Sequence, residues 1–145
     1  MKIGILNGPN LNLLGKRQPE IYGAKTLEEI NNDLLTYANA QDLSLVFFQS
    51  NHEGEFIDFI HQSEDLDGII MNPGAFMSYS YAIRDAIASV KTDIIEVHIS
   101  NIYSRETFRQ HSVTAPVTAG QVTGFGDTVY KLALNYFILL KGNNI

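Results

Sequence analysis

The chain has 145 residues with 45% hydrophobic content, 18% charged content and a formal net charge of -6. This length and composition are typical of one soluble globular domain, so we expect a single domain over residues 1–145. There are no cysteines, which excludes a disulfide framework, an iron–sulfur cluster and a thiol nucleophile, and the negative charge argues against general nucleic-acid binding.

Apolar runs alternate with helical patterns from the start of the chain. Residues 3–6 predict a buried strand, and apolar residues at helical spacing after Thr26 predict a helix whose Glu29 completes a capping box. Residues 45–48 predict a second strand. A second helix is predicted over 53–60, with acidic residues in its first turn, where the helix dipole favours them.

The same alternation continues in the second half of the chain. Residues 68–71 predict a third strand, which ends at the turn signal Asn72-Pro73-Gly74. A third helix is predicted over 76–90 and a fourth strand over 94–98. Residues 104–109 indicate a short helical turn.

The last predicted helix extends through residue 140, with Gly142 as its stop. Gly124-Phe125-Gly126 precedes it and is too short and too late in the chain for a dinucleotide fingerprint, so we expect a tight turn there. Alternating strands and helices imply a parallel sheet covered by helices on both faces. We therefore predict an α/β fold with a five-stranded, flavodoxin-like parallel sheet.

The chain begins directly with a strand-like run, without the basic, apolar and small-residue succession of a secretory leader. No apolar stretch approaches the ~20 residues of a membrane span. Together with the lack of cysteines, these features predict a cytoplasmic protein.

The connection over residues 8–23 is long for a strand-to-helix loop in a compact domain. Active-site lids are a common reason for such length, and the loop contains glycine and proline residues that can act as hinges. It carries Arg17 and Tyr22. A guanidinium favours the ionised form of a neighbouring phenol, so this pair could supply a strong base. The alternative is an ordinary surface loop.

Glu96 and His98 lie two residues apart on the predicted fourth strand and therefore on one face of it. A carboxylate in an apolar strand is costly unless it is paired, and it would fix the tautomer of His98 and raise its basicity. His98 could then act as a general acid or base near neutral pH. The alternative is a structural pair.

Polar residues follow three of the predicted strands. Ligands of parallel α/β sheets bind outside the carboxyl ends of the strands, so we expect residues 7–12, 72–74 and 96–101 to meet on one rim. Asn72 and the turn after it suit an anion site, to which Ile99-Ser100 could add backbone donors.

The sequence lacks the motifs of phosphate-binding, dinucleotide-binding and serine-hydrolase sites. The sequence has no phosphate-cradling GxxxxGK[ST] loop, no GxGxxG after the first strand and no GxSxG elbow. Its histidines do not show metal-ligand spacing. Arg109 is a candidate polar contact to a substrate, or a solvated helix-end charge. The sequence therefore predicts acid–base chemistry without a metal or cofactor.

Several motifs, in order along nearly the whole chain, resemble type II 3-dehydroquinate dehydratase. They are residues 7–15 (NGPNLNLLG), 49–54 (QSNHEG), 72–75 (NPGA), 82–86 (AIRDA), 96–101 (EVHISN), and 120–121 (GQ) with 124–126 (GFG). The resemblance implies a single catalytic domain, a dodecamer built from trimers, and dehydration of 3-dehydroquinate to 3-dehydroshikimate in the shikimate pathway without a cofactor.

The resemblance also implies catalytic roles. Tyr22 would remove the proton alpha to the ketone, helped by Arg17, and Asn10 would hold a water that stabilises the enolate. His98, oriented by Glu96, would protonate the departing hydroxyl.

Substrate-binding roles follow in the same way. The family pattern assigns the substrate carboxylate to Asn72, Ile99 and Ser100, and a ring hydroxyl to Arg109. Asp85 matches an aspartate that reaches in from a neighbouring subunit.

The chain departs from the family pattern after residue 75. The family usually has an aromatic residue, a threonine and then a histidine that contacts substrate hydroxyls, whereas this chain has Phe76, Met77 and Ser78. Serine is shorter and cannot carry a positive charge. We therefore expect Ser78 to weaken substrate binding or to alter hydroxyl recognition, with the acid–base residues retained.

Two other function classes compete with this interpretation. The departure at residues 76–81 would fit a binding module that has lost catalysis, although a pure binder has no need of a paired acid and base. A flavin-carrying flavodoxin would need a phosphate-binding loop after the first strand, where this chain has asparagine, leucine and proline.

Overall fold

The computed structural model describes residues 1–143, and its sheet confirms the predicted fold class. Five parallel strands lie in the order β2-β1-β3-β4-β5. The strands are β1 (Lys2–Asn7), β2 (Ser44–Gln49), β3 (Gly68–Asn72), β4 (Ile94–His98) and β5 (Gly120–Thr123). Four of these strands, β1 to β4, lie at the positions predicted from apolar runs in the sequence. β5 is a short edge strand to which the sequence pattern assigned no residues.

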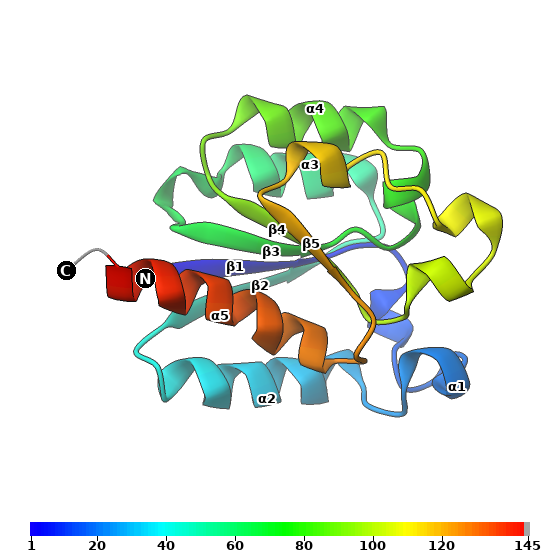
Figure 1. The fold of residues 1–145 in the computed structure, drawn as a ribbon, viewed down its shortest axis with the longest axis horizontal. Helices are drawn as coiled ribbons and strands as arrows, with labels where there is room; N and C mark the ends of the chain where they lie inside the picture. Colours follow the sequence, from blue (N-terminus) through cyan, green and yellow to red (C-terminus); the bar gives the residue numbers. More distant parts are fainter. Residues whose placement is uncertain (144–145) are drawn as a thin grey trace.

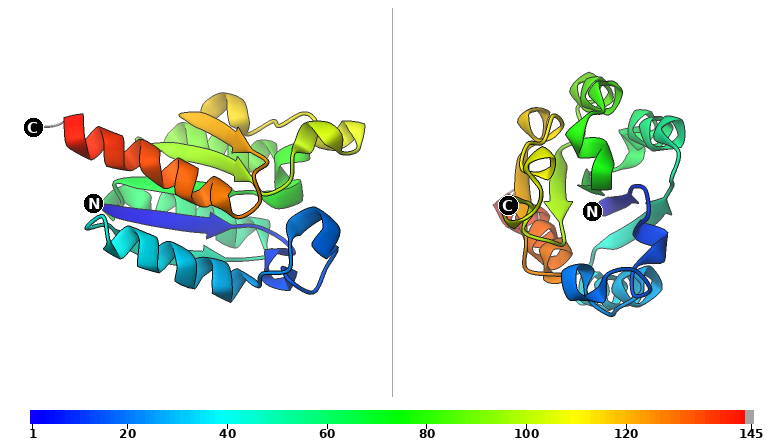
Figure 2. Two further views of the ribbon diagram at one scale, coloured as in Figure 1. Left: turned by 60° about the horizontal axis from the view of Figure 1, so that its bottom comes forward. Right: turned by 90° about the vertical axis from the view of Figure 1, so that its right-hand side faces the viewer.

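Helices cover both faces of the sheet (Figure 1). α2 (Leu27–Asn39) and α5 (Thr128–Asn143) lie on one face, and α3 (Glu53–His61) and α4 (Tyr81–Ser89) lie on the other. The end-on view shows the two helical layers on either side of the strands (Figure 2). The short helix α1 (Pro19–Tyr22) lies on the same side of the sheet as α2, beyond the carboxyl ends of the strands (Figure 1).

The core divides into two clusters, one on each face of the sheet. Because neighbouring side chains of a strand point to opposite faces, Ile5 and Ile70 pack with α2 and α5, whereas Leu6 and Ile69 pack with α3 and α4. At Gly68 an added Cβ would lie 2.1 Å from the Phe137 ring, so this glycine allows α5 to approach β3 closely.

A capping box explains where α2 begins. The Thr26 hydroxyl accepts from the Glu29 backbone N–H, and the Glu29 carboxylate accepts from the Thr26 N–H, which confirms the predicted capping box. Before α3, the Ser50 hydroxyl accepts from the His52 N–H at 2.9 Å and donates to Glu55.

The structure corrects the predicted helix over residues 76–90. A 3-10 helix over Gly74–Ser78 comes first, and α4 begins only at Tyr81. Ser80 starts the new helix, because its hydroxyl accepts from the Ile83 N–H at 3.0 Å. The same hydroxyl donates to Glu53 of α3, so the break in the helix is also a contact between α3 and α4.

Two smaller predictions are also corrected. Residues 104–109 form parts of two 3-10 turns, Ile102–Ser104 and Thr107–Arg109, rather than one helical turn. α5 continues past Gly142 instead of stopping there. The expected tight turn before α5 is confirmed, since Gly124, Phe125 and Gly126 all have positive φ.

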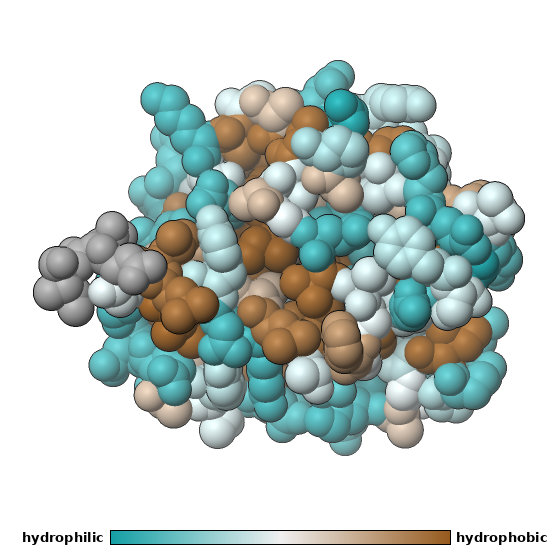
Figure 3. All heavy atoms as spheres, in the orientation of Figure 1, coloured by the Kyte–Doolittle hydropathy of each residue, from teal (hydrophilic) through white to brown (hydrophobic). Residues whose placement is uncertain are grey.

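The surface of the face that carries α5 is a mixture of polar and apolar patches (Figure 3). Exposed apolar residues on α5 include Leu132, Tyr136 and Leu139. Within residues 1–143, no helix is long and apolar enough to cross a membrane.

Candidate active site

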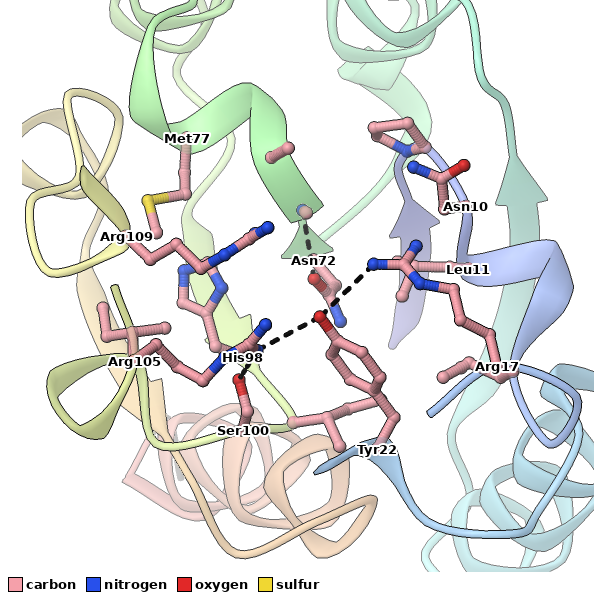
Figure 4. Close-up of a pocket in the computed structure, with 16 residues that line it drawn as sticks. Asn10, Leu11, Arg17, Tyr22, Asn72, Met77, His98, Ser100, Arg105 and Arg109 are labelled. Carbon is pink, nitrogen blue, oxygen red and sulfur yellow. Dashed lines mark hydrogen bonds between the residues drawn. The ribbon is translucent and has the colours of Figure 1, made fainter. Parts of the chain in front are cut away.

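The strand ends and the long loop together form a cavity at the carboxyl rim of the sheet (Figure 4). The three polar clusters expected on one rim do meet there, represented by Asn10, Asn72 and His98. The lining residues are Pro9, Asn10, Leu11, Leu14, Arg17, Tyr22, Asn72, Gly74, Ala75, Met77, His98, Ile99, Ser100, Ile102, Arg105 and Arg109.

His98 and Glu96 form the expected pair at the end of β4. Nε2 of His98 lies 2.6 Å from Oε1 of Glu96, and the two side chains are buried. Glu96 is completely buried and does not line the cavity, whereas His98 does. Since Nε2 is engaged with Glu96, Nδ1 is the ring nitrogen that can exchange a proton with a bound molecule.

Three further side chains hold the Glu96 carboxylate. Ser112 and Gln121 donate to Oε1 at 2.8 and 2.9 Å, and Thr114 donates to Oε2 at 2.5 Å. Burial acts to raise the pKa of Glu96, but the hydrogen bond and charge attraction from His98 and the hydrogen bonds from Thr114 and Ser112 lower it below its ordinary range. Glu96 is therefore held in its ionised form beside the His98 ring.

Stability should depend on pH through Glu96. A carboxyl group whose pKa is lower in the folded state stabilises the fold above its unfolded pKa, and that stabilisation is lost as the pH falls through the folded pKa. The urea midpoint of the native protein should therefore fall as the pH drops below about 4.3, the ordinary pKa of a glutamate, and Glu96→Gln should show a shallower fall. Glu28→Gln, at an exposed position of α2, should keep the native slope. Parallel slopes for Glu96→Gln and the native protein would contradict this account.

Tyr22 places its phenol oxygen between two guanidinium groups. Nη2 of Arg17 lies 3.5 Å from that oxygen, and Nη1 of Arg105 lies 3.1 Å from it. Both guanidinium groups also lie over the Tyr22 ring, 5.2 and 5.3 Å from its centroid. Two positive charges therefore flank the phenol oxygen and cover the ring.

Arg105 is the residue that sequence reasoning missed. It follows the Ile102–Ser104 turn and is 83 residues from Tyr22 in the chain. Its Nη1 also donates to the Ser100 hydroxyl at 3.1 Å, which connects the base to the rim of β4. The available signal was the scarcity of arginine: of four in the chain, Arg17, Arg105 and Arg109 all line this cavity.

The loop that carries Tyr22 is shaped by positive-φ residues. Gly15 and Gly23 have φ of 83° and 85°, and α1 lies between them. At its other end, Asn10 adopts a left-handed conformation with φ of 67°, and its N–H donates to Oδ1 of Asn51 at 2.9 Å. The two ends of the loop thus place Asn10 and Tyr22 on the same cavity.

The remaining polar groups give the cavity a positive character. Arg109 points into the cavity (Figure 4) and is held by Glu106, whose carboxylate accepts from its Nε at 2.8 Å. Asn72 and the Ile99-Ser100 segment also line the cavity. Cations that converge in this way attract an anionic ligand even in a protein of net charge -6.

Besides Glu96, two of the expected site residues, Ser78 and Asp85, do not line the cavity of their own chain. Ser78 is half-buried, and its hydroxyl donates to the sulfur of Met77 at 3.8 Å. Met77, rather than Ser78, forms this wall of the cavity. Asp85 is exposed on α4. Any contact that Asp85 makes with a substrate would therefore have to be in a neighbouring subunit.

The chain is similar to known proteins over nearly its whole length. The family model described as dehydroquinase class II matches residues 1–138. The 3-dehydroquinate dehydratase of Bacillus pumilus is 56% identical over 135 residues, covering 92% of each chain. That of Bacillus subtilis is 53% identical over 139 residues, covering 95% of this chain and 94% of the relative.

A solved structure shows the same fold. The type II dehydroquinase of Butyrivibrio crossotus superposes with a TM-score of 0.92 at 48% identity, covering 94% of this chain and 96% of that one. Since the family model spans nearly the whole chain and the relatives share more than half of their residues with it, the chain belongs to the class II dehydroquinase family.

Proposed function

We propose that this protein dehydrates 3-dehydroquinate to 3-dehydroshikimate, a reaction of the shikimate pathway. The observation that carries the proposal is one cavity lined by a phenol between two guanidinium groups and by an imidazole paired with a buried carboxylate. These groups are a base and an acid, and the elimination requires one of each.

The base acts first. The Tyr22 phenolate, stabilised by Arg17 and Arg105, removes the proton alpha to the ketone and leaves an enolate. Asn10 holds a water that donates to the enolate oxygen. Stabilising that oxygen lowers the barrier because negative charge develops there during proton removal.

The acid completes the elimination. The enolate re-forms the ketone, the C1–C2 bond becomes double, and the C1 hydroxyl leaves as water after protonation by His98. The proton comes from Nδ1, because Nε2 is bonded to Glu96. The ionised Glu96 stabilises the protonated imidazole before the transfer and fixes its orientation.

Binding uses the other lining groups. Asn72 and the backbone of Ile99 and Ser100 hold the substrate carboxylate, and Arg109 holds a ring hydroxyl. The cations around the cavity favour the anionic substrate. The loop that carries Tyr22 acts as a lid, and residues 1–145 act as one catalytic domain.

An absorbance assay for the conjugated enone product tests the proposal. Purified protein should convert 3-dehydroquinate with an increase in ultraviolet absorbance, and no added metal or cofactor should be needed. A folded protein that binds 3-dehydroquinate without turnover would instead favour the binding module suggested by the departure at residues 76–81.

Ser78 offers a test of how this protein departs from its family. Because its hydroxyl contacts the Met77 sulfur and lies outside the cavity, Ser78→Ala should change kcat/KM by less than about threefold, within the range of a weak hydrogen bond. Ser78→His should raise kcat/KM by restoring a hydroxyl contact. Steady-state kinetics on the two variants decide the matter, and no gain from Ser78→His would count against the proposed deficit.

The assembly is also a proposal. A dodecamer built from trimers is supported by the exposed position of Asp85 and by the exposed aromatic residues Tyr79, Tyr81 and Phe108, which a subunit contact would cover. Light scattering on the purified protein tests this proposal, because it measures the mass of the assembly and hence the number of chains in it. We propose a cytoplasmic location for this assembly, supported by the cysteine-free sequence.

A further inference from the structure

A buried hydrogen-bonded chain connects α5 to the ends of β1 and β3 beneath the cavity. The Tyr130 hydroxyl donates to Oδ1 of Asn7 at 2.5 Å and accepts from Nδ2 of Asn72 at 3.0 Å. Tyr130 is completely buried, and Asn7 and Asn72 are 1% and 3% exposed. Asn72 lines the cavity, whereas Tyr130 does not.

This chain of hydrogen bonds determines which way the Asn72 amide faces. An amide side chain can exchange its oxygen and nitrogen by a half-turn with little change in shape. Here Nδ2 faces the Tyr130 oxygen, and Oδ1 accepts from the Gly74 N–H at 3.2 Å. The half-turn would place Nδ2 against the Gly74 donor and leave two buried groups without partners, which is costly.

Because the Tyr130 hydroxyl donates to Asn7, its oxygen can only accept from Asn72. A hydroxyl has one hydrogen to donate, and Tyr130 gives it to Oδ1 of Asn7. Burial raises the pKa of Tyr130 far above its ordinary value, so the hydroxyl keeps this hydrogen throughout the pH range in which proteins are folded.

The amide nitrogen of Asn72 has a second hydrogen. Tyr130 accepts one of the two, and the planar geometry of the amide fixes the direction of the other. We propose that Tyr130 is a positioning residue that holds Asn72 with this second N–H ready for the substrate carboxylate. This inference rests on the proposed function, in which Asn72 binds that carboxylate.

Tyr130→Phe removes only the hydroxyl and tests the inference. We expect KM for 3-dehydroquinate to rise roughly tenfold or more, the loss typical of one hydrogen bond to a charged group. The kcat should fall less than about twofold and keep its pH dependence, because Tyr22 and His98 are untouched and general acid–base groups are what set that dependence.

Tyr37→Phe is a matched control. The Tyr37 hydroxyl on α2 donates to Oδ1 of Asn135 on α5 at 2.8 Å, so this variant also removes a tyrosine–asparagine hydrogen bond to the same helix. Neither residue lines the cavity. Thermal unfolding should show a loss of stability for both variants, but only Tyr130→Phe should change KM.

The outcomes separate this inference from the proposed function. A native protein that neither turns over nor binds 3-dehydroquinate, by calorimetry, overturns both. Suppose that the native protein is active and that Asn72→Ala raises KM. A Tyr130→Phe enzyme whose KM equals that of the native protein then overturns the inference alone. An equal rise of KM in Tyr37→Phe overturns it too, because the effect would then follow stability. If the native protein binds without turnover, the Kd of each variant replaces KM in the same comparison.

Discussion

His98→Ala should lower kcat by about 10²–10⁴-fold, the usual contribution of a general acid–base group. The fold should survive, because Glu96 keeps its hydrogen bonds from Ser112, Thr114 and Gln121 when the imidazole is removed. Enone formation at saturating substrate measures the effect, and circular dichroism checks the fold.

Two further variants make the result for His98 interpretable. His98→Asn retains a side-chain donor for Glu96 and should be as inactive as His98→Ala while remaining more stable, since the buried carboxylate keeps a fourth partner. His111→Ala removes an exposed histidine that does not line the cavity and should have native kcat. Near-native turnover in either His98 variant would refute the acid assignment.

Tyr22→Phe should produce a loss of similar size, about 10²–10⁴-fold in kcat. The substitution removes the oxygen that faces Arg17 and Arg105 but keeps the ring over which both guanidinium groups lie. Because the ring contacts remain, substrate binding should change much less than turnover, and KM should stay within a few-fold of the native value.

An exposed tyrosine on the same rim provides the control for Tyr22. Tyr103 is 59% exposed and does not line the cavity, so Tyr103→Phe should be kinetically native. A Tyr22→Phe enzyme with native kcat would show that another group removes the proton. A rise in KM without a fall in kcat would instead place Tyr22 among the binding residues.

The sequence predicted what local chemistry determines. Strand positions followed from apolar runs, because strands of a parallel sheet are buried on both faces. The Glu96–His98 pair followed from the two-residue period of a strand, and the Arg17–Tyr22 pair from two residues on one short loop. In each case the partners are close in the chain, so the sequence could suggest the pair, and the structure shows the contact.

Contacts between distant segments could not be predicted in this way. Arg105 approaches Tyr22 across 83 residues, and nothing in the sequence around it marks a site. The break before α4 depends on Ser80, which caps one helix and also donates to Glu53 of another. β5 is a partly exposed edge strand, so it lacks the continuous apolar run by which the other strands were identified.

Proton exchange in heavy water tests most directly whether Tyr22 is the base and His98 the acid. With 3-dehydroquinate in D₂O, His98→Ala should exchange the alpha proton for deuterium, seen by mass spectrometry, while releasing little enone. Tyr22→Phe should do neither, because without the base no enolate forms. Exchange in Tyr22→Phe, or a His98→Ala enzyme that neither exchanges nor eliminates although it binds substrate, would contradict the assignment of Tyr22 as base and His98 as acid.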